Sequence, residues 1–187
     1  MLPLIQSGVR ISERHSYHPS HEITRRAMMR EILTRVNYHD LFSIPNGWGG
    51  RIGVLPRYPN GDYLVNLSNR GLWGDFGGGV KAREYHLEAL QRELTEEVPQ
   101  WRDYLLSLLP QAEIYTLEEF FPHDYKRSKR TIRAKVLCIV DVPEDFPSDF
   151  SPTEEVISLR RVRDLNELVL SMNLGLQQLC RVLDDTH

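Results

Sequence analysis

The chain has 187 residues, 41% of them hydrophobic, which suits one globular domain with a single core and leaves no room for a second domain of ordinary size. Its formal net charge is only −3, so no overall positive field favours nucleic-acid binding. No apolar stretch approaches the roughly 20 residues that cross a bilayer, so we expect a cytoplasmic protein without a membrane partner.

The first part of the chain is predicted to be a helical extension, residues 1–45, of the main part at residues 46–187. Ser20 can cap a helix there, because a serine hydroxyl accepts a hydrogen bond from the first helical turn. The apolar face of this helix would cover the sheet or form the contact of a homodimer. Its members are Met29, Ile32, Leu33 and Val36.

Two strands are predicted next, from Arg51 to Arg57 and from Tyr63 to Leu67, because both runs are rich in β-forming residues. The Asn60-Gly61 pair between them favours a tight hairpin turn. Pro56 has no N–H to donate, so we expect the first strand to be an edge strand or to carry a bulge near its end.

The stretch from Gly78 to Glu97, GGVKAREYHLEALQRELTEE, contains a predicted helix with two distinct faces. Leucines and a valine at helical spacing form an apolar stripe that is suited to packing against a sheet: Leu87, Leu90, Leu94 and Val98. Glu93, Glu96 and Glu97 are spaced i, i+3 and i+4 and therefore lie on one neighbouring patch. Crowded like charges need solvent or a cation, and oxygen ligands favour Mg²⁺ or Mn²⁺.

The same stretch carries a longer pattern, in which Gly78 is followed after five residues by Glu84 and after seven more by Arg92-Glu93-Leu94, one residue, and Glu96-Glu97. This pattern resembles the Nudix box. The resemblance implies an α/β fold of the Nudix type, an α/β/α sandwich with a mixed β-sheet between helices. It also implies a metal-dependent enzyme that hydrolyses a pyrophosphate bond in a nucleoside diphosphate linked to another moiety, by attack of water on a phosphorus.

The resemblance also assigns roles to individual residues. Glu96 and Glu97 match the principal metal ligands, and Glu93 matches the glutamate that either binds metal or takes a proton from water. Glu84 and Arg92 match a pair that ties the glycine loop, which contains Gly77 and Gly78, to the helix and so orients the ligands. The backbone of this loop passes close to metal and phosphate, which makes Gly77 a metal ligand and Gly78 a substrate-binding residue. The further substrate-binding candidates are Arg70, Lys126 and Arg130.

Three residues depart from the Nudix pattern. Pro99 replaces the glycine expected after the helix, so the helix should stop there without a glycine cap. Phe76 stands where the family usually has proline, and Arg83 stands where it often has glycine. These two changes affect the shape of the loop and hence the choice of substrate.

Four elements are predicted after the box. Trp101 to Leu109 forms a short inserted helix that packs near the box, because it has too much apolar surface to stay exposed. Thr131 to Val142 is apolar enough for a central strand, with Cys138 in the core. Glu154 to Leu170 resembles the closing strand and turn of the family, and a last helix runs to about Leu183.

Positive charge is concentrated just before the predicted central strand, in Lys126, Arg127, Lys129, Arg130, Arg133 and Lys135. One interpretation is a solvated hairpin. The other is a surface that holds a polyphosphate or RNA backbone, which implies an RNA cap or a diphosphoinositol polyphosphate as substrate. A third alternative is a catalytically silent module that senses nucleotides. The candidates for a fourth acidic ligand or base are Glu118, Glu119, Asp124, Glu154 and Glu155.

Overall fold

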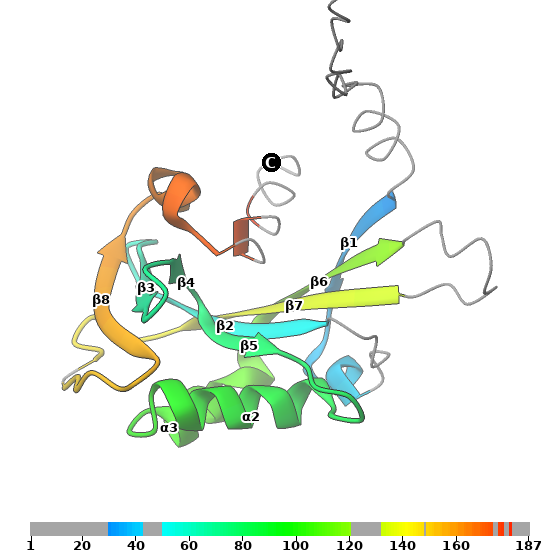
Figure 1. Ribbon diagram of the computed structural model, residues 1–187, viewed down its shortest axis with the longest axis horizontal. Helices are drawn as coiled ribbons and strands as arrows, with labels where there is room; N and C mark the ends of the chain where they lie inside the picture. Colours follow the sequence, from blue (N-terminus) through cyan, green and yellow to red (C-terminus); the bar gives the residue numbers. More distant parts are fainter. Residues whose placement is uncertain are drawn as a thin grey trace, which may run out of the picture.

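A mixed β-sheet with helical segments on both faces organises the chain (Figure 1). The computed structural model describes residues 30–42, 50–120, 132–147, 149–173, 176, 177 and 180. Six strands follow one another across the sheet in the order β1 (Arg30–Val36), β6 (Glu113–Phe120), β7 (Ile132–Asp141), β2 (Arg51–Arg57), β3 (Tyr63–Ser68) and β4 (Trp73–Gly74). Strand β5 (Phe76–Gly79) pairs with β2, and β8 (Val156–Val162) pairs with β3.

Strand β2 lies inside the sheet, so the expectation that Pro56 makes it an edge strand is wrong. β2 is parallel to β7 along its whole length. On its other side it pairs with β5 as far as Val54 and with β3 at Arg57. The carbonyl of Arg57 accepts from the N–H of Val142, directly after β7, so the backbone of Pro56 points to the other side, where neither β5 nor β3 pairs with it. An interior strand tolerates this proline because no partner needs its missing N–H.

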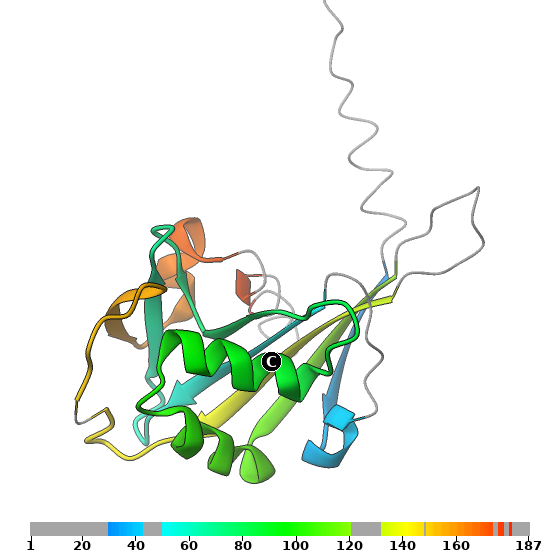
Figure 2. The same ribbon diagram turned by 60° about the horizontal axis from the view of Figure 1, so that its bottom comes forward.

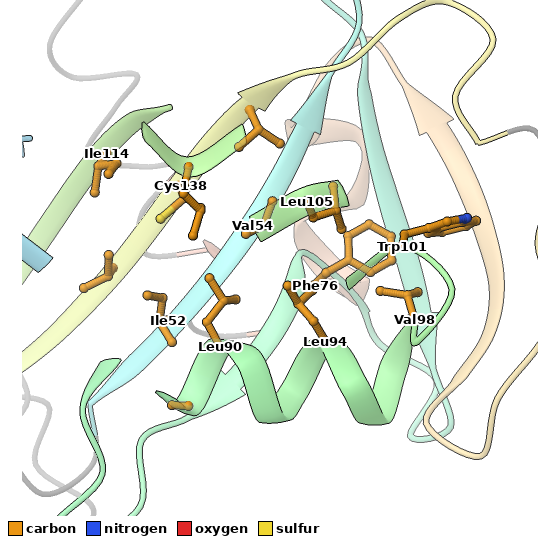
Figure 3. Packing of buried hydrophobic residues seen from close by; sticks show 14 of the residues in the cluster. Ile52, Val54, Phe76, Leu90, Leu94, Val98, Trp101, Leu105, Ile114 and Cys138 are labelled. Atoms are coloured by element: carbon orange, nitrogen blue, oxygen red, sulfur yellow. The ribbon is translucent and has the colours of Figure 1, made fainter. Parts of the chain in front are cut away.

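Helices α2 (His86–Glu97) and α3 (Arg102–Leu108) cover one face of the sheet, side by side (Figure 2). Figure 3 shows the core between them and the sheet, where Leu90 and Leu94 of α2 pack with Ile52 and Phe76. Each of these side chains is fully buried. Complete burial of one such side chain stabilises a fold by about 1.5–3 kcal/mol. The predicted inserted helix and central strand are therefore confirmed as α3 and β7, and Cys138 lies in this core.

The opposite face is covered by the segment that follows β8. The 3-10 helix η3 (Leu165–Ser171) begins after Asp164, whose side chain accepts a hydrogen bond from the N–H of Asn166. Buried residues of this segment pack on Leu55, Leu117 and Leu137 of the sheet: they are Leu168, Met172, Leu176 and Cys180. Helical segments thus lie on both sides of the sheet, and the predicted α/β sandwich with a mixed sheet is confirmed.

The prediction of a helix through Val36 is wrong, because residues 30–36 form strand β1 at the edge of the sheet. All seven residues pair with β6, from Arg30 opposite Phe120 to Val36 opposite Ile114. The β-branched residues Ile32, Thr34 and Val36 favour a strand, and the pairing satisfies the backbone groups on that side. Ser20 and Met29, on which the predicted helix depended, lie outside the described residues.

Two short 3-10 helices complete the described elements, η1 (Tyr38–Phe42) after β1 and η2 (Leu109–Gln111) before β6. Leu41 of η1 and Leu109 of η2 are buried in the same core as α2. In the part of the chain described above, no helix combines the length and the hydrophobicity that a membrane crossing requires.

Candidate functional site

Helix α2 presents the acidic residues of the box. At its start, the N–H of Tyr85 donates a 2.8 Å hydrogen bond to the carboxylate of Glu88, three residues further along the chain. It ends at Glu97, and Val98 leaves helical geometry with φ −143° immediately before Pro99. The predicted stop without a glycine cap is therefore confirmed.

Arg92 joins the helix to the glycine loop. Its Nε and Nη2 donate to the two carboxylate oxygens of Glu84 at 2.9 and 3.1 Å. Nη2 also donates to the carbonyl of Gly79 at 2.9 Å, and Nη1 donates to Glu93 at 2.5 Å. One guanidinium thus fixes the loop, the start of the box and one of the three clustered glutamates.

The loop before α2 contains one residue with a left-handed backbone, Arg83. Arg83 has φ +67°, a conformation that glycine adopts without steric cost. This is the position at which the Nudix pattern often has glycine, so Arg83 adopts the backbone shape without the residue that favours it.

Glu93 and Glu97 reach the glycine loop from the same helix. Oε2 of Glu97 accepts a 2.8 Å hydrogen bond from the N–H of Gly77, whose φ of +149° favours glycine. The carboxyl group of Glu93 lies against the Cα of Gly78, in the space that a Cβ at residue 78 would need. Two carboxyl groups therefore approach two successive glycines: Glu97 binds the N–H of Gly77, and Glu93 occupies the space left by the missing side chain of Gly78.

The carboxyl group of Glu97 has a raised pKa. Burial raises its pKa to about 9, and the negative charges of Asp75 and Glu93 act in the same direction. The charge of Arg51 and the N–H of Gly77 oppose the change without cancelling it. A half-buried carboxyl group among other acids needs additional positive charge nearby if it is to be ionised at neutral pH.

Glu96 lies apart from this pair. Its side chain is 46% exposed, and its nearest cation is Arg92, at 3.6 Å. The three glutamates therefore do not converge on one point: Arg92 contacts Glu93 and Glu96, whereas Gly77 binds Glu97. Within the described ranges, no group of three His, Cys, Asp or Glu side chains has the arrangement of a metal site.

Two charged residues near the glycine loop were not predicted. Arg51 of β2 donates through Nη1 and Nη2 to the two carboxylate oxygens of Asp75, both at 2.5 Å, and Nη2 lies 3.5 Å from the carbonyl of Gly77. Asp75 is fully buried and Arg51 is 15% exposed. The sequence signal was a charged residue, one in β2 and one between β4 and β5, each separated by one residue from a glycine: Arg51 from Gly53 and Asp75 from Gly77.

The remaining candidates lie elsewhere or outside the described residues. Arg70 is exposed on the turn between β3 and β4, and no contact of the described residues joins it to the box. Lys126 and Arg130 lie outside the described part of the chain. Among the candidate acids, Glu154 and Glu155 are exposed in a loop whose Thr153 hydroxyl donates a 3.0 Å hydrogen bond to the carbonyl of Glu97.

No family model matches the chain, and no curated protein matches it. Among the solved structures that resemble it is an Ap4A hydrolase from C. elegans, with a TM-score of 0.46, 14% identity, and coverage of 74% of this chain and 96% of that chain. The E. coli dihydroneopterin triphosphate pyrophosphohydrolase has a TM-score of 0.45 and 16% identity, with coverage of 70% of this chain and 90% of that chain. A Nudix hydrolase from M. smegmatis has a TM-score of 0.44 and 16% identity, with coverage of 75% of this chain and 86% of that chain. At these values the likeness transfers no residue's role to this chain.

Proposed function

We propose that this chain is a Nudix hydrolase that uses Mg²⁺ or Mn²⁺ to hydrolyse a pyrophosphate bond in a nucleoside diphosphate linked to another moiety. The observation that carries the proposal is the approach of two box carboxyl groups to the glycine loop, Glu97 to Gly77 and Glu93 to Gly78. The Nudix resemblance implies the same four positions as the reacting part of the molecule.

By their chemistry, the donor groups suit a hard divalent cation. All of them are oxygens, from the carboxyl groups of Glu96 and Glu97, the carbonyl of Gly77 and, in the first of its two alternative roles, Glu93, and such ligands suit Mg²⁺ and Mn²⁺. The raised pKa of Glu97 supports this assignment, because a cation is the compensating charge that its ionised form needs. When bound, the ion would neutralise charge on the phosphate oxygens and lower the pKa of a water molecule.

The protein's own part in the reaction is to hold groups in place and to accept a proton. The water oxygen forms a new bond to phosphorus, the bridging oxygen leaves with the bonding electron pair, and one proton of the water passes to a carboxylate. Glu93 is our candidate for this acceptor, because Arg92 fixes its carboxylate beside Gly78. Two phosphorylated products result.

The basic cluster supports an alternative substrate class. Lys135 of β7 is the register partner of Arg51 on β2, so the end of the cluster reaches the strand that carries the unpredicted ion pair. A capped RNA or a diphosphoinositol polyphosphate would bring extra phosphate charge to this strand. Capped-RNA hydrolysis would then fall steeply with salt, and neutral substitutions from Lys126 to Lys135 would flatten that dependence.

A substrate panel tests the proposal. Purified protein with Mg²⁺ or Mn²⁺ is incubated with ADP-ribose, nucleoside triphosphates, dinucleoside polyphosphates, capped RNA and diphosphoinositol phosphates, and the products are separated by chromatography. We expect metal-dependent release of two phosphorylated products from a nucleotide. Silence of the wild type across the whole panel would contradict hydrolysis and favour a nucleotide-sensing module, which titration calorimetry with the same nucleotides would identify.

A further inference from the structure

The ion pair between Arg51 and Asp75 lies on the sheet face opposite α2. Ile52 and Val54 of β2 point into the core under α2, so the alternating residue Gly53 faces the other way. A Cβ at residue 53 would collide with the carboxylate of Asp75 and approach Nη1 of Arg51. The pair therefore rests directly on the backbone of Gly53, and the missing side chain there makes room for it.

Asp75 is held on three sides. Besides Arg51, its Oδ1 accepts from Nδ2 of Asn173 at 3.4 Å, and its backbone carbonyl accepts from Nδ2 of Asn66 at 3.0 Å. Asn173 in turn donates its N–H to the carbonyl of Trp73 at 2.8 Å and accepts from the N–H of Leu176 at 2.9 Å. A chain of contacts thus runs from the segment after η3 to Arg51.

This chain of contacts ends at Gly77. The carbonyl of Gly77 lies 3.5 Å from Nη2 of Arg51, and its N–H is bonded to Glu97 at 2.8 Å. Both polar groups of one glycine in a left-handed conformation are therefore engaged by side chains, one from β2 and one from α2. Loss of either contact would remove one of the two side-chain contacts that hold this conformation, which glycine can leave more easily than other residues.

We propose that Asp75 and Asn173 are positioning residues for the reaction at Glu97: they hold Arg51 against Gly77, and so fix the backbone to which the proposed cation and phosphate would bind. This inference rests on the proposed function. Asp75 touches no reacting atom and reaches Gly77 through Arg51, and Asn173 reaches Arg51 through Asp75.

A purely structural role explains this pair less well. Replacing a buried ion pair by apolar residues is often neutral or stabilising, so the stability of the fold does not by itself require an ion pair at this place. A second ion pair on the same strand offers a comparison, since Arg57 donates to Asp141 at 2.7 Å and to Glu113 at 2.8 Å. That pair is more exposed and contacts neither the glycine loop nor α2.

The test compares Asp75→Asn, Arg51→Met and the double variant with Arg57→Met as the matched control. We expect each single variant at the pair to lower kcat by about 10–100-fold with a much smaller change in KM, as for other residues that orient ligands. Because Asp75 acts through Arg51, the double variant should be no less active than Arg51→Met. Its melting temperature should rise above that of either single variant, since no unpaired buried charge remains.

Asn173→Ser keeps a side chain that can cap the following turn but removes the contact with Asp75. We expect a smaller drop in kcat and little loss of melting temperature. The positioning role is overturned if the double variant regains wild-type kcat together with its stability, or if Arg57→Met lowers kcat as much as Asp75→Asn does.

A readout that needs no substrate separates this inference from the proposed function. Hydrogen exchange of the Gly77 amide, followed by NMR, should be faster in Asp75→Asn than in wild type and unchanged in Arg57→Met. If the wild type is inactive on every substrate, the proposed function fails and the exchange rates still decide the positioning role. Equal rates in wild type and Asp75→Asn would overturn it.

Discussion

Glu97 accepts a 2.8 Å hydrogen bond from the N–H of Gly77, a residue 20 positions earlier in the chain. The contact joins the last residue of α2 to the glycine loop of β5. The last residue of the box helix is therefore bonded to the loop that precedes the helix.

Glu97→Gln is expected to lower kcat by at least about 100-fold, a usual cost of removing a group that handles charge or protons in a reaction. Melting temperature should stay close to wild type, because glutamine keeps an oxygen that can accept from Gly77. Steady-state kinetics and thermal unfolding measure the two effects. Glu88→Gln on the same helix is the control, since Glu88 is exposed and glutamine can replace it in its bond to Tyr85. Equal losses in both variants would contradict the assignment of Glu97.

Gly78→Ala should lower activity, whereas Gly79→Ala should not. A Cβ at residue 78 would collide with the carboxyl group of Glu93, and a Cβ at residue 79 meets nothing within 4 Å. Kinetics of the two variants under identical metal concentrations check the difference. Activity that is unchanged in Gly78→Ala would show that the place of Glu93 beside the loop has no role in turnover.

Arg92→Lys is expected to lower kcat by about 10–100-fold, because the ammonium group cannot reproduce the fork that binds Glu84, Glu93 and the carbonyl of Gly79. The free energy of unfolding should fall by about 1–3 kcal/mol, measured by urea denaturation. Arg102→Lys is the control, because Arg102 pairs with its exposed neighbour Asp103. A fully active Arg92→Lys protein would argue against the orienting role of Arg92.

Because of His86, we expect the free energy of unfolding to fall in acid. Its side chain is buried, its Nε2 lies 3.5 Å from the carbonyl of Ala134, and burial lowers its pKa below the usual 6.5. The unfolded chain therefore takes up a proton at a higher pH than the folded chain does. The contribution of His86 is fully present above about pH 6.5 and is lost as the pH falls toward the folded pKa, with a slope of at most about 1.4 kcal/mol per pH unit.

Urea unfolding at several pH values measures this dependence. His86→Gln should flatten the acidic part of the stability curve, and substitution of the exposed His39 of η1 by glutamine should leave it unchanged. Identical curves for wild type and His86→Gln would contradict the prediction.

Much of the fold follows from local patterns in the sequence. The helical spacing of Leu90 and Leu94 predicted the buried face of α2, and both leucines are fully buried. The long apolar run predicted β7 as a central strand, and β7 lies between β6 and β2. Strand β1 was missed because its apolar residues fit a helical face as well as a strand, and pairing with β6 decided between them.

The candidate site was only partly predictable, for a different reason. The box residues are close in sequence, so their spacing predicts which of them share a face. Arg51 and Asp75 are 24 residues apart, and their contact depends on the pairing of β2 with β5. No periodicity in β2 or in the segment before β5 predicts such a contact. The contacts of Arg92 with Glu93 and Glu96 likewise depend on side-chain conformations, which spacing in the sequence does not determine.

Strand β2 pairs on one side with β5 as far as Val54 and with β3 at Arg57, and Pro56 lies between the two pairings. Among the described strands, β5 pairs with β2 alone, so its other edge carries no ladder. The outward amide and carbonyl of Gly77 are therefore left to side chains, and Glu97 and Arg51 contact them. The chemistry proposed for this protein thus depends on a strand edge that the sheet itself does not use.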